Sequence, residues 1–367
     1  MHRPIASIIA WLDRVDPEVH RRIKGLRLVT AYGIATALGT LHEVASEAPT
    51  GVSLGTLAAS FALWASVSEA KTTRATSSRD LTLLCLAAAV GAVVFALFEP
   101  MLRAHFSAGG EWVLASGAFA VGYLKRYGIL GAGVGSQIYI GQLTAYSMGL
   151  GPTDLTAIAV AAAIAIIAAV IPRLLSGPAE RPATMAAMGP ITGHPRTYPA
   201  ELVMGLQATA ATLLIVILNS FLGLTESAWA VTACVYVIGA TASGTLDRVR
   251  RRIVGTLVGV PLALVCLPFA AQVPLFIWCA AAVGMVVYAM ALPERYDIAC
   301  GAFAFTLLVT LAVNGEHSMP VLLARLWETV LGSVIGAAMA MFVLPLRANA
   351  HETQGNARRH PHHRRGR

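Results

Sequence analysis

Residues 155–170 read LTAIAVAAAIAIIAAV, a run of sixteen residues without a charged or strongly polar side chain except one threonine. A helix or strand on the surface of a soluble protein would alternate apolar and polar residues, and this run does not. A helix needs roughly 20 apolar residues to cross the hydrocarbon layer, or somewhat fewer where neighbours bury its ends. We therefore predict a transmembrane helix here.

The rest of the chain has the same character. Of its 367 residues, 56% are hydrophobic and only 13% are charged, and the mean hydropathy is +0.68. So few charges cannot cover the surface of a soluble protein of this size. The alternating segments of about ten residues that build a membrane β-barrel are also missing. The composition predicts an all-α integral membrane protein.

The hydrophobic pattern divides into about twelve segments, six before and six after a polar, proline-containing stretch at 176–200. The predicted spans are 28–45, 51–69, 81–99, 111–124, 128–147, 153–172, 201–222, 227–245, 253–270, 273–292, 298–314 and 322–345. Before them, residues 1–27 combine Trp11 with a basic cluster at helical spacing, which predicts a cytoplasmic helix lying in the membrane interface. The basic tail at 348–367 is predicted to be disordered.

The lysines and arginines set the orientation of these spans. If each span crosses the membrane, 25 of the 27 basic residues fall on one side, and Arg103 and Arg325 fall on the other. Loops rich in lysine and arginine stay in the cytoplasm, so both termini are expected there. The net charge of +8 then faces anionic lipid and is no sign of nucleic acid binding. We expect a multi-pass protein of the bacterial cytoplasmic (inner) membrane.

The two groups of six spans resemble each other. Lys125-Arg126-Tyr127, before the fifth span, matches Glu294-Arg295-Tyr296, before the eleventh, at an offset of 169 residues. The sixth and twelfth spans align at an offset of 173, which brings Pro172 onto Pro345. Six is an even number, so both units start on the same side. The prediction is a parallel repeat of 28–175 and 201–347, with any solute path where the units meet.

Motifs for other functions are lacking. The chain has no phosphate-binding or dinucleotide-binding glycine pattern and no HExxH. Its five cysteines form no CxxC pair, and the His-Pro-His-His of the tail has no second ligand cluster nearby in sequence. We therefore expect neither an enzyme nor a resident cofactor or metal.

The stretch 226–265 reads ESAWAVTACVYVIGATASGTLDRVRRRIVGTLVGVPLALV. Its Trp-Ala at the start of a span, its basic turn and its Arg-x-x-Gly-Thr-x-x-Gly resemble the fusaric acid resistance and aromatic acid exporter families. The last span, which starts Arg325-Leu-Trp-Glu-Thr, is similar to the closing helix of that membrane domain. The resemblance covers 201–347 well and 28–175 in outline. It describes a compact form without the large cytoplasmic domain of bigger members, and it implies a proton-driven exporter of small organic, often aromatic, acids.

Charges inside the last span give the sharpest candidate site. Glu328 lies about eight residues into a helix that starts near Pro320, a depth of roughly 12 Å. Charges at such depth usually face a bundle interior or a wet cavity. One hypothesis is that Glu328 exchanges protons while Arg325 pairs with it or with a substrate carboxylate. A static ion pair is the alternative. Further polar residues are assigned to a substrate or proton path as a hypothesis: Thr329, Gln207, Asn219, Tyr236 and Gln137. For the last four of these, hydrogen bonding between helices is the alternative.

Two more sets of residues have structural interpretations. The pairs Gly255/Gly259 and Gly332/Gly336 are typical of faces where helices pack closely. Arg248, Arg250, Arg251 and Arg252 are expected to anchor the cytoplasmic interface.

Three functions stay open at this point: an exporter, a passive anion channel, and a non-transport envelope scaffold. The expected partners are the lipid bilayer and a small organic acid. A periplasmic adaptor protein and a homo-oligomer are open possibilities.

Overall fold

The computed structural model describes residues 16, 20–46, 53–70, 73–106, 109–176, 198–224, 227–270, 273–292, 294–313 and 319–345. The described residues are helical with short connections and contain no strand, which confirms the all-α prediction. The first half consists of α2 (His20–Ser46), α3 (Leu54–Ser68), α4 (Arg74–Arg103), α5 (Gly109–Tyr123), α6 (Gly128–Met148) and α7 (Leu155–Leu175). The second half consists of α8 (Ala200–Leu222), α9 (Ser227–Val237), α10 (Ala242–Ala270), α11 (Pro274–Ala291), α12 (Tyr296–Val313) and α13 (Met319–Phe342). Two 3-10 turns, η1 (Leu124–Tyr127) and η2 (Pro152–Asp154), precede α6 and α7.

Each predicted span corresponds to one of these helices, but two boundaries were wrong. The span predicted at 227–245 ends at Val237, and α10 already begins at Ala242. Thr241 starts α10, because its hydroxyl accepts a hydrogen bond of 3.1 Å from the backbone N–H of Gly244. The basic turn expected at 248–252 is therefore part of a helix.

The other boundary is the one predicted between the interfacial helix at 1–27 and the first span at 28–45. The basic cluster Arg21, Arg22, Lys24 and Arg27 lies on the first turns of α2, which continues without a break past residue 27. Residues 1–15, most of the linker and the predicted disordered tail lie outside the described residues.

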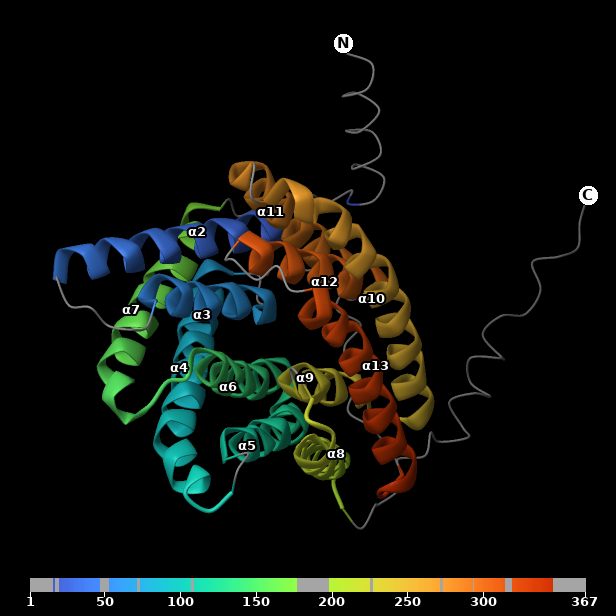
Figure 1. Ribbon diagram of the computed structural model, residues 1–367. Helices are drawn as coiled ribbons and strands as arrows, with labels where there is room; N and C mark the ends of the chain where they lie inside the picture. The colour runs from blue at the N-terminus through green and yellow to red at the C-terminus, as the bar shows by residue number, and fades with distance from the viewer. Residues whose placement is uncertain are drawn as a thin grey trace, which may run out of the picture.

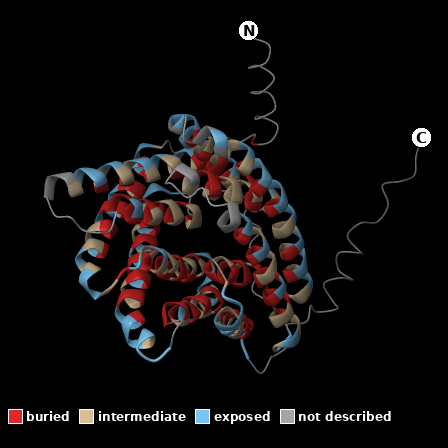
Figure 2. Cartoon of the chain, in the orientation of Figure 1, coloured by how far each residue is buried: buried red, intermediate tan, exposed pale blue. Residues whose placement is uncertain are grey.

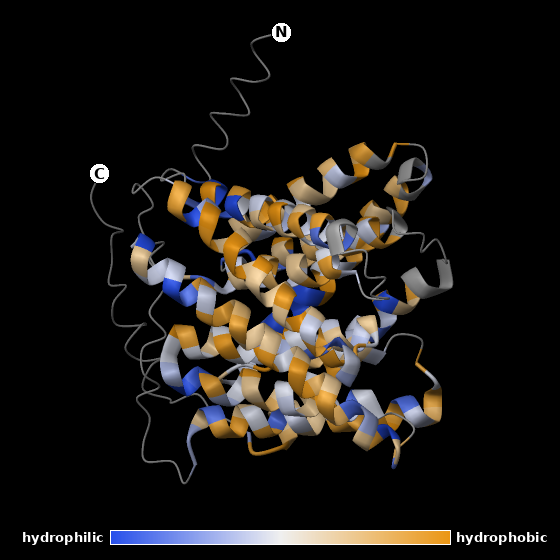
Figure 3. Cartoon of the chain, turned by 90° about the vertical axis from the view of Figure 1, so that its left-hand side faces the viewer, coloured by the Kyte–Doolittle hydropathy of each residue, from blue (hydrophilic) through white to orange (hydrophobic). Residues whose placement is uncertain are grey.

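Several helices have the length and surface of membrane spans. Four are long and apolar enough by length and composition: Arg74–Arg103, Pro152–Leu175, Ala200–Leu222 and Leu323–Phe342. Large apolar side chains also point outward, as Leu83, Leu86, Val90 and Leu97 do along one face of α4. Figure 2 shows such exposed residues on the outer sides of the helices, and Figure 3 shows hydrophobic residues along most of them. An apolar exterior of this kind matches lipid rather than water.

The same helix pairs pack in both halves. In the first half α4 packs on α6, α5 on α6 and α3 on α7. In the second half the equivalent pairs α10 and α12, α11 and α12, and α9 and α13 pack together. Between the halves α5 packs on α8, and the equivalent pair, α11 and α2, is also in contact. In Figure 1, α5, α6, α8 and α9 lie between α4 and α7 on one side and α10 and α13 on the other.

Candidate functional site

Tyrosines join the two halves through hydrogen bonds. Tyr139 of α6 bonds to Thr232 of α9 at 2.9 Å between their hydroxyl oxygens, and Tyr236 of α9 bonds to Ser136 of α6 at 2.7 Å. The rings of Tyr139 and Tyr236 meet edge to face, with centroids 6.0 Å apart. Polar and aromatic side chains from both halves therefore meet along one line, which runs between α6 and α9.

A second aromatic group lies beside this line. Trp64 of α3 contacts Tyr288 of α11 and Phe303 of α12, with ring centroids 6.2 and 5.5 Å apart. Tyr288 and Phe303 also contact each other at 6.2 Å. Aromatic rings of both halves thus form a wall, and aromatic pairs in this geometry attract one another.

Arg252 brings a positive charge to these aromatic residues. Its guanidinium donates a 3.4 Å hydrogen bond to the hydroxyl of Tyr296, and its charge acts on Tyr236 and Tyr288. Its Nε is buried and has no hydrogen-bond partner. The guanidinium therefore retains hydrogen-bonding capacity that the described part of the chain does not use.

Lys125 adds a second cation at the same end of the interface. It belongs to η1, between α5 and α6, and it lies close enough to Arg248 for the two charges to repel. Burial lowers the pKa of Lys125 to about 8, and the repulsion from Arg248 acts in the same direction. Within the described residues, none of Lys125, Arg248 and Arg252 takes part in an ion pair.

These side chains are deep in the protein and yet keep accessible surface. Tyr236, Tyr288 and Tyr296 are enclosed by protein, but each is only partly buried by accessible area. The same is true of Arg252 and Lys125. Each of these side chains therefore keeps some surface that water or a small solute can reach.

The charged residues of α13 lie on its buried face. Glu328 is fully buried, and the guanidinium of Arg325 stands 4.5 Å from the ring centroid of Trp229 on α9. Thr329 donates its hydroxyl hydrogen to the backbone oxygen of Arg325 at 2.7 Å. Glu328 and Arg325 are therefore both buried, as expected, and Trp229 lies close to Arg325.

Gln137 and Gln207, which were also assigned to a path, make hydrogen bonds between helices. Gln137 donates to the backbone oxygen of Trp64 at 2.8 Å and to Ser68 at 2.9 Å, joining α6 to α3. Gln207 donates to the backbone oxygen of Val343 at 2.7 Å, at the end of α13. Of the assigned residues only Tyr236 lies on the α6–α9 line.

Asn219 belongs to a cluster that links the halves near the opposite end of the helices. The carboxylate of Glu111 on α5 accepts hydrogen bonds from Asn219 of α8 at 2.7 Å, from Ser227 of α9 at 2.5 Å and from Tyr146 of α6 at 3.3 Å. Glu111 is buried. The sequence alone does not single out Glu111, since its partners come from distant segments.

The glycine pairs lie where helices cross closely. A Cβ at Gly332 would overlap the backbone oxygen of Ala230 on α9, and Gly336 packs against Cys234 of the same helix. Gly255 and Gly259 face the backbone of α12 in the same way. Only glycine permits such approach, because any side chain would push the helices apart.

The four arginines of α10 differ in their surroundings. Arg250 is exposed, whereas Arg251 pairs with Asp247 at 2.9 Å and donates to the backbone oxygen of Glu294 at 3.0 Å. Arg248 donates to the backbone oxygen of Ile238 at 3.3 Å. Arg252 alone turns toward the tyrosines, so the four residues are not one uniform anchor.

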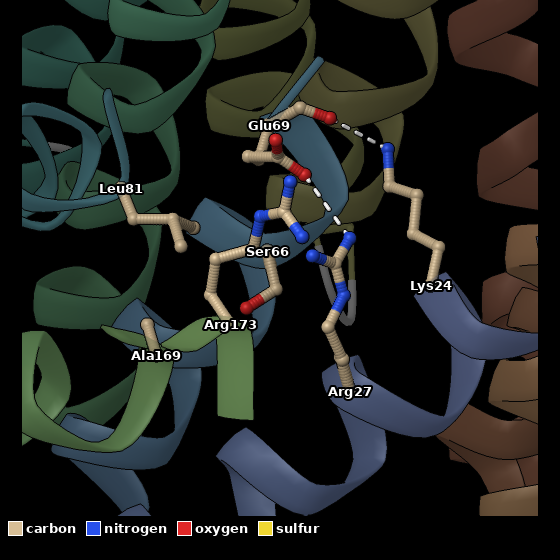
Figure 4. Close-up of a pocket in the computed structure, with 7 residues that line it drawn as sticks. All are labelled: Lys24, Arg27, Ser66, Glu69, Leu81, Ala169 and Arg173. Carbon is tan, nitrogen blue, oxygen red and sulfur yellow. Dashed lines mark hydrogen bonds and ion pairs between the residues drawn. The ribbon is translucent and has the colours of Figure 1, made fainter. Parts of the chain in front are cut away.

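A buried ionic cluster joins α2, α3, α4 and α7 (Figure 4). Arg27 pairs with Glu69 at 3.3 Å, and Ser77 donates to the other carboxylate oxygen of Glu69 at 2.7 Å. Lys24 donates to the backbone oxygen of Glu69 at 2.7 Å, and Arg173 donates to Ser77 at 2.7 Å. Arg27 reaches Glu69 because α2 packs on α3 and passes its end.

No group of three metal-ligating side chains occurs among the residues that the structure describes. The described cysteines are all free, and Cys279 is exposed on the surface of α11.

Apolar outward faces around a polar interface between two helical halves define a multi-pass membrane protein. Residues 210–339 match the family described as fusaric acid resistance protein-like, which confirms the family resemblance found in the second half of the sequence. At a coarse level the match indicates a membrane transport protein of the exporter kind. The comparisons with curated proteins and with solved structures give no match.

Proposed function

We propose that the protein exports small organic acids, aromatic or amphipathic, across the bacterial cytoplasmic membrane and that a proton gradient drives the export. One observation carries the proposal: tyrosines and cations from both halves meet at the interface of the halves, and the described residues provide no ion-pair partner for these cations. An organic acid needs an apolar surface for its ring and a positive charge for its carboxylate. This interface offers both.

Glu328 is the proposed proton carrier. It is fully buried on α13, the helix that packs on α9 and so lies one helix away from the tyrosines. An ionisable group at such a position changes its charge at a cost that depends on the surrounding helices. Proton exchange at Glu328 could therefore couple to movement of α9, with Arg325 and Trp229 completing the contact.

The proposed transport movement follows from two parallel units with both termini in the cytoplasm. The equivalent packing of helix pairs in the two halves supports this arrangement. Rocking of one unit against the other would open the interface alternately to each side. An adaptor protein and a homo-oligomer remain predictions about the partners.

Transport in everted membrane vesicles tests the proposal, with radiolabelled benzoate as the probe. Respiration acidifies the lumen of such vesicles, and a weak acid distributes passively toward the alkaline side. Valinomycin with K⁺ collapses the inside-positive electrical potential, which would otherwise drive the benzoate anion inward through a passive channel. Under these conditions, accumulation of benzoate in the acidic lumen identifies active export. We expect accumulation with the natural protein, its loss when an uncoupler collapses the gradient, and its loss in Glu328→Gln. Asp247→Asn, at an exposed position on α10, is the control and should accumulate benzoate normally.

The alternatives give different results in the same assay. With the electrical potential collapsed, a passive channel would equilibrate benzoate without accumulation and would not depend on Glu328. A scaffold would give no transport in any vesicle, although the protein is inserted and stable. Either result would contradict the proposal.

A further inference from the structure

We infer that Lys125, Arg248 and Arg252, together with the rings of Tyr236 and Tyr288, form a binding site for the carboxylate of an aromatic acid. The inference rests on the proposed function and adds the residues that select the substrate. In the orientation that the arginine distribution predicts, the site lies toward the cytoplasmic end of the interface, where an exported acid would enter.

The first argument is charge. Lys125 and Arg248 lie close enough for their charges to repel, and Arg252 follows Arg248 by one turn of α10. The described residues provide no carboxylate that pairs with any of the three, and the side chains that surround Arg252, which are Tyr296, Cys300 and Tyr236, carry no carboxylate. Like charges at close range repel, and enclosure by protein strengthens the repulsion. An anion bound between them would relieve it.

The second argument is hydrogen-bonding capacity. Among the described residues, the buried Nε of Arg252 has no acceptor, and the one acceptor of its Nη1 is the Tyr296 hydroxyl at 3.4 Å, a long bond. A buried donor without an acceptor is costly. The planar guanidinium fork can bind both oxygens of a carboxylate through Nε and one terminal nitrogen.

The third argument is the apolar surface beside the charge. Tyr288 continues into the aromatic wall with Trp64 and Phe303, so a ring carried by the acid would meet other rings. Edge-to-face and stacked contacts between rings are favourable. A ligand with a ring and a carboxylate would use both parts of the site.

Equilibrium binding to the full-length protein in lipid nanodiscs tests the inference. The probe is radiolabelled benzoate, and benzyl alcohol, a ring without the charge, is the competing control. We expect Arg252→Gln to weaken benzoate binding at least tenfold and to remove the preference for benzoate over benzyl alcohol. Arg252→Lys should retain part of the affinity. Arg250→Gln, on the exposed face two residues away, should change it less than twofold. Equal losses in Arg252→Gln and Arg250→Gln would overturn the inference.

A second experiment uses the protein without substitutions, so that it tests the inference even if the Arg252 variants misfold. The chain has three lysines, Lys24, Lys71 and Lys125, so NMR of the methyl groups of ¹³C-dimethylated lysine can follow each one. Saturating benzoate should raise the titration midpoint of Lys125 by about one pH unit and leave Lys24 and Lys71 unchanged. An unchanged midpoint with bound benzoate would place the ligand elsewhere.

The inference and the proposed function can fail separately. Benzoate binding that depends on Arg252 without accumulation in everted vesicles would keep the site and reject proton-driven export. Accumulation by Arg252→Gln with the KM of the natural protein would keep export and reject the site.

Discussion

The Oε1 atom of Glu111 on α5 accepts a 2.7 Å hydrogen bond from the side-chain amide of Asn219 on α8. The two residues are 108 positions apart and belong to different halves of the chain. With Ser227 of α9 on the same oxygen, this contact fastens the halves at the end opposite Lys125 and Arg252. The interface therefore has the hydrogen-bonded carboxylate of Glu111 at one end and the cations Lys125 and Arg252 at the other.

Replacing Glu111 by alanine should weaken the contact between the halves. We expect the free energy of unfolding in mixed SDS micelles to fall by about 2–4 kcal/mol, because buried hydrogen bonds to a charged group are lost and their donors stay buried. In a double-mutant cycle with Asn219→Ala, the coupling should be about 1–2 kcal/mol. Additive effects of the two substitutions would show that the hydrogen bond contributes nothing to stability.

Two glycine substitutions should have opposite effects. Gly332→Ala should destabilise the protein by about 1–3 kcal/mol, because the added methyl group overlaps the backbone of α9 and forces the helices apart. Gly33→Ala on α2 is the matched control, since a Cβ there meets open space. It should stabilise the helix by about 0.5–1 kcal/mol. Thermal unfolding of both variants in the same detergent makes the comparison, and equal shifts would refute it.

Glu69→Gln should be among the most disruptive changes on the predicted cytoplasmic side. The substitution removes the negative charge that compensates Arg27, whose side chain is only 12% exposed. Breaking a buried ion pair by removing one partner costs about 3–5 kcal/mol, and partial exposure of Arg27 brings the expected loss to about 3 kcal/mol. Ser66→Ala, in the same cluster, should change stability by less than about 0.5 kcal/mol, because Ser66 bonds only within its own helix. Chemical unfolding of the two variants tests the difference.

Lys125 should titrate at an unusually low pH. Burial and Arg248 lower its pKa to about 8 in the folded protein, whereas an unfolded lysine keeps a pKa near 10.4. Below pH 8 the residue is protonated in both states, and its enclosed charge destabilises the fold. As the pH rises from about 8 to about 10, the folded state loses the proton first, so this penalty disappears. The NMR midpoint of Lys125 measures the shift, and a midpoint near 10 would contradict it. The destabilisation of the natural protein relative to Lys125→Gln should shrink over the same pH interval.

Reporter fusions test the predicted orientation. Green fluorescent protein fused at the carboxyl terminus should fluoresce, because it folds in the cytoplasm. Alkaline phosphatase fused after residue 106 or residue 224 should be active, because these positions precede loops predicted to face the periplasm. The reverse pattern at either position would show that the helices do not all cross the membrane in the predicted order.

Much of the fold was predictable because the controlling signals are local. A continuous apolar run such as residues 155–170 specifies a membrane helix by its own length and composition, without help from the rest of the chain. The glycine pairs were recognisable for a similar reason, since their spacing lies on one helix face. The error at residues 227–245 arose because hydropathy does not register a helix break: Ile238 and Gly239 are apolar, and the hydroxyl of Thr241 decides where α10 starts.

The sequence alone therefore determined the class of protein, the positions of the helices, the family and the buried charges of Glu328 and Arg325. Only the tertiary structure decided which polar residues meet. Tyr236 and Ser136 are 100 residues apart, and Lys125 and Arg248 more than 120, so no local pattern could join them. These residues come together only because one half of the chain packs on the other. That packing is the sum of many weak contacts along whole helix faces. The structure likewise gives the partners of Gln137 and Gln207, which make hydrogen bonds between helices, and it places Arg252 beside Tyr296 at the interface of the halves.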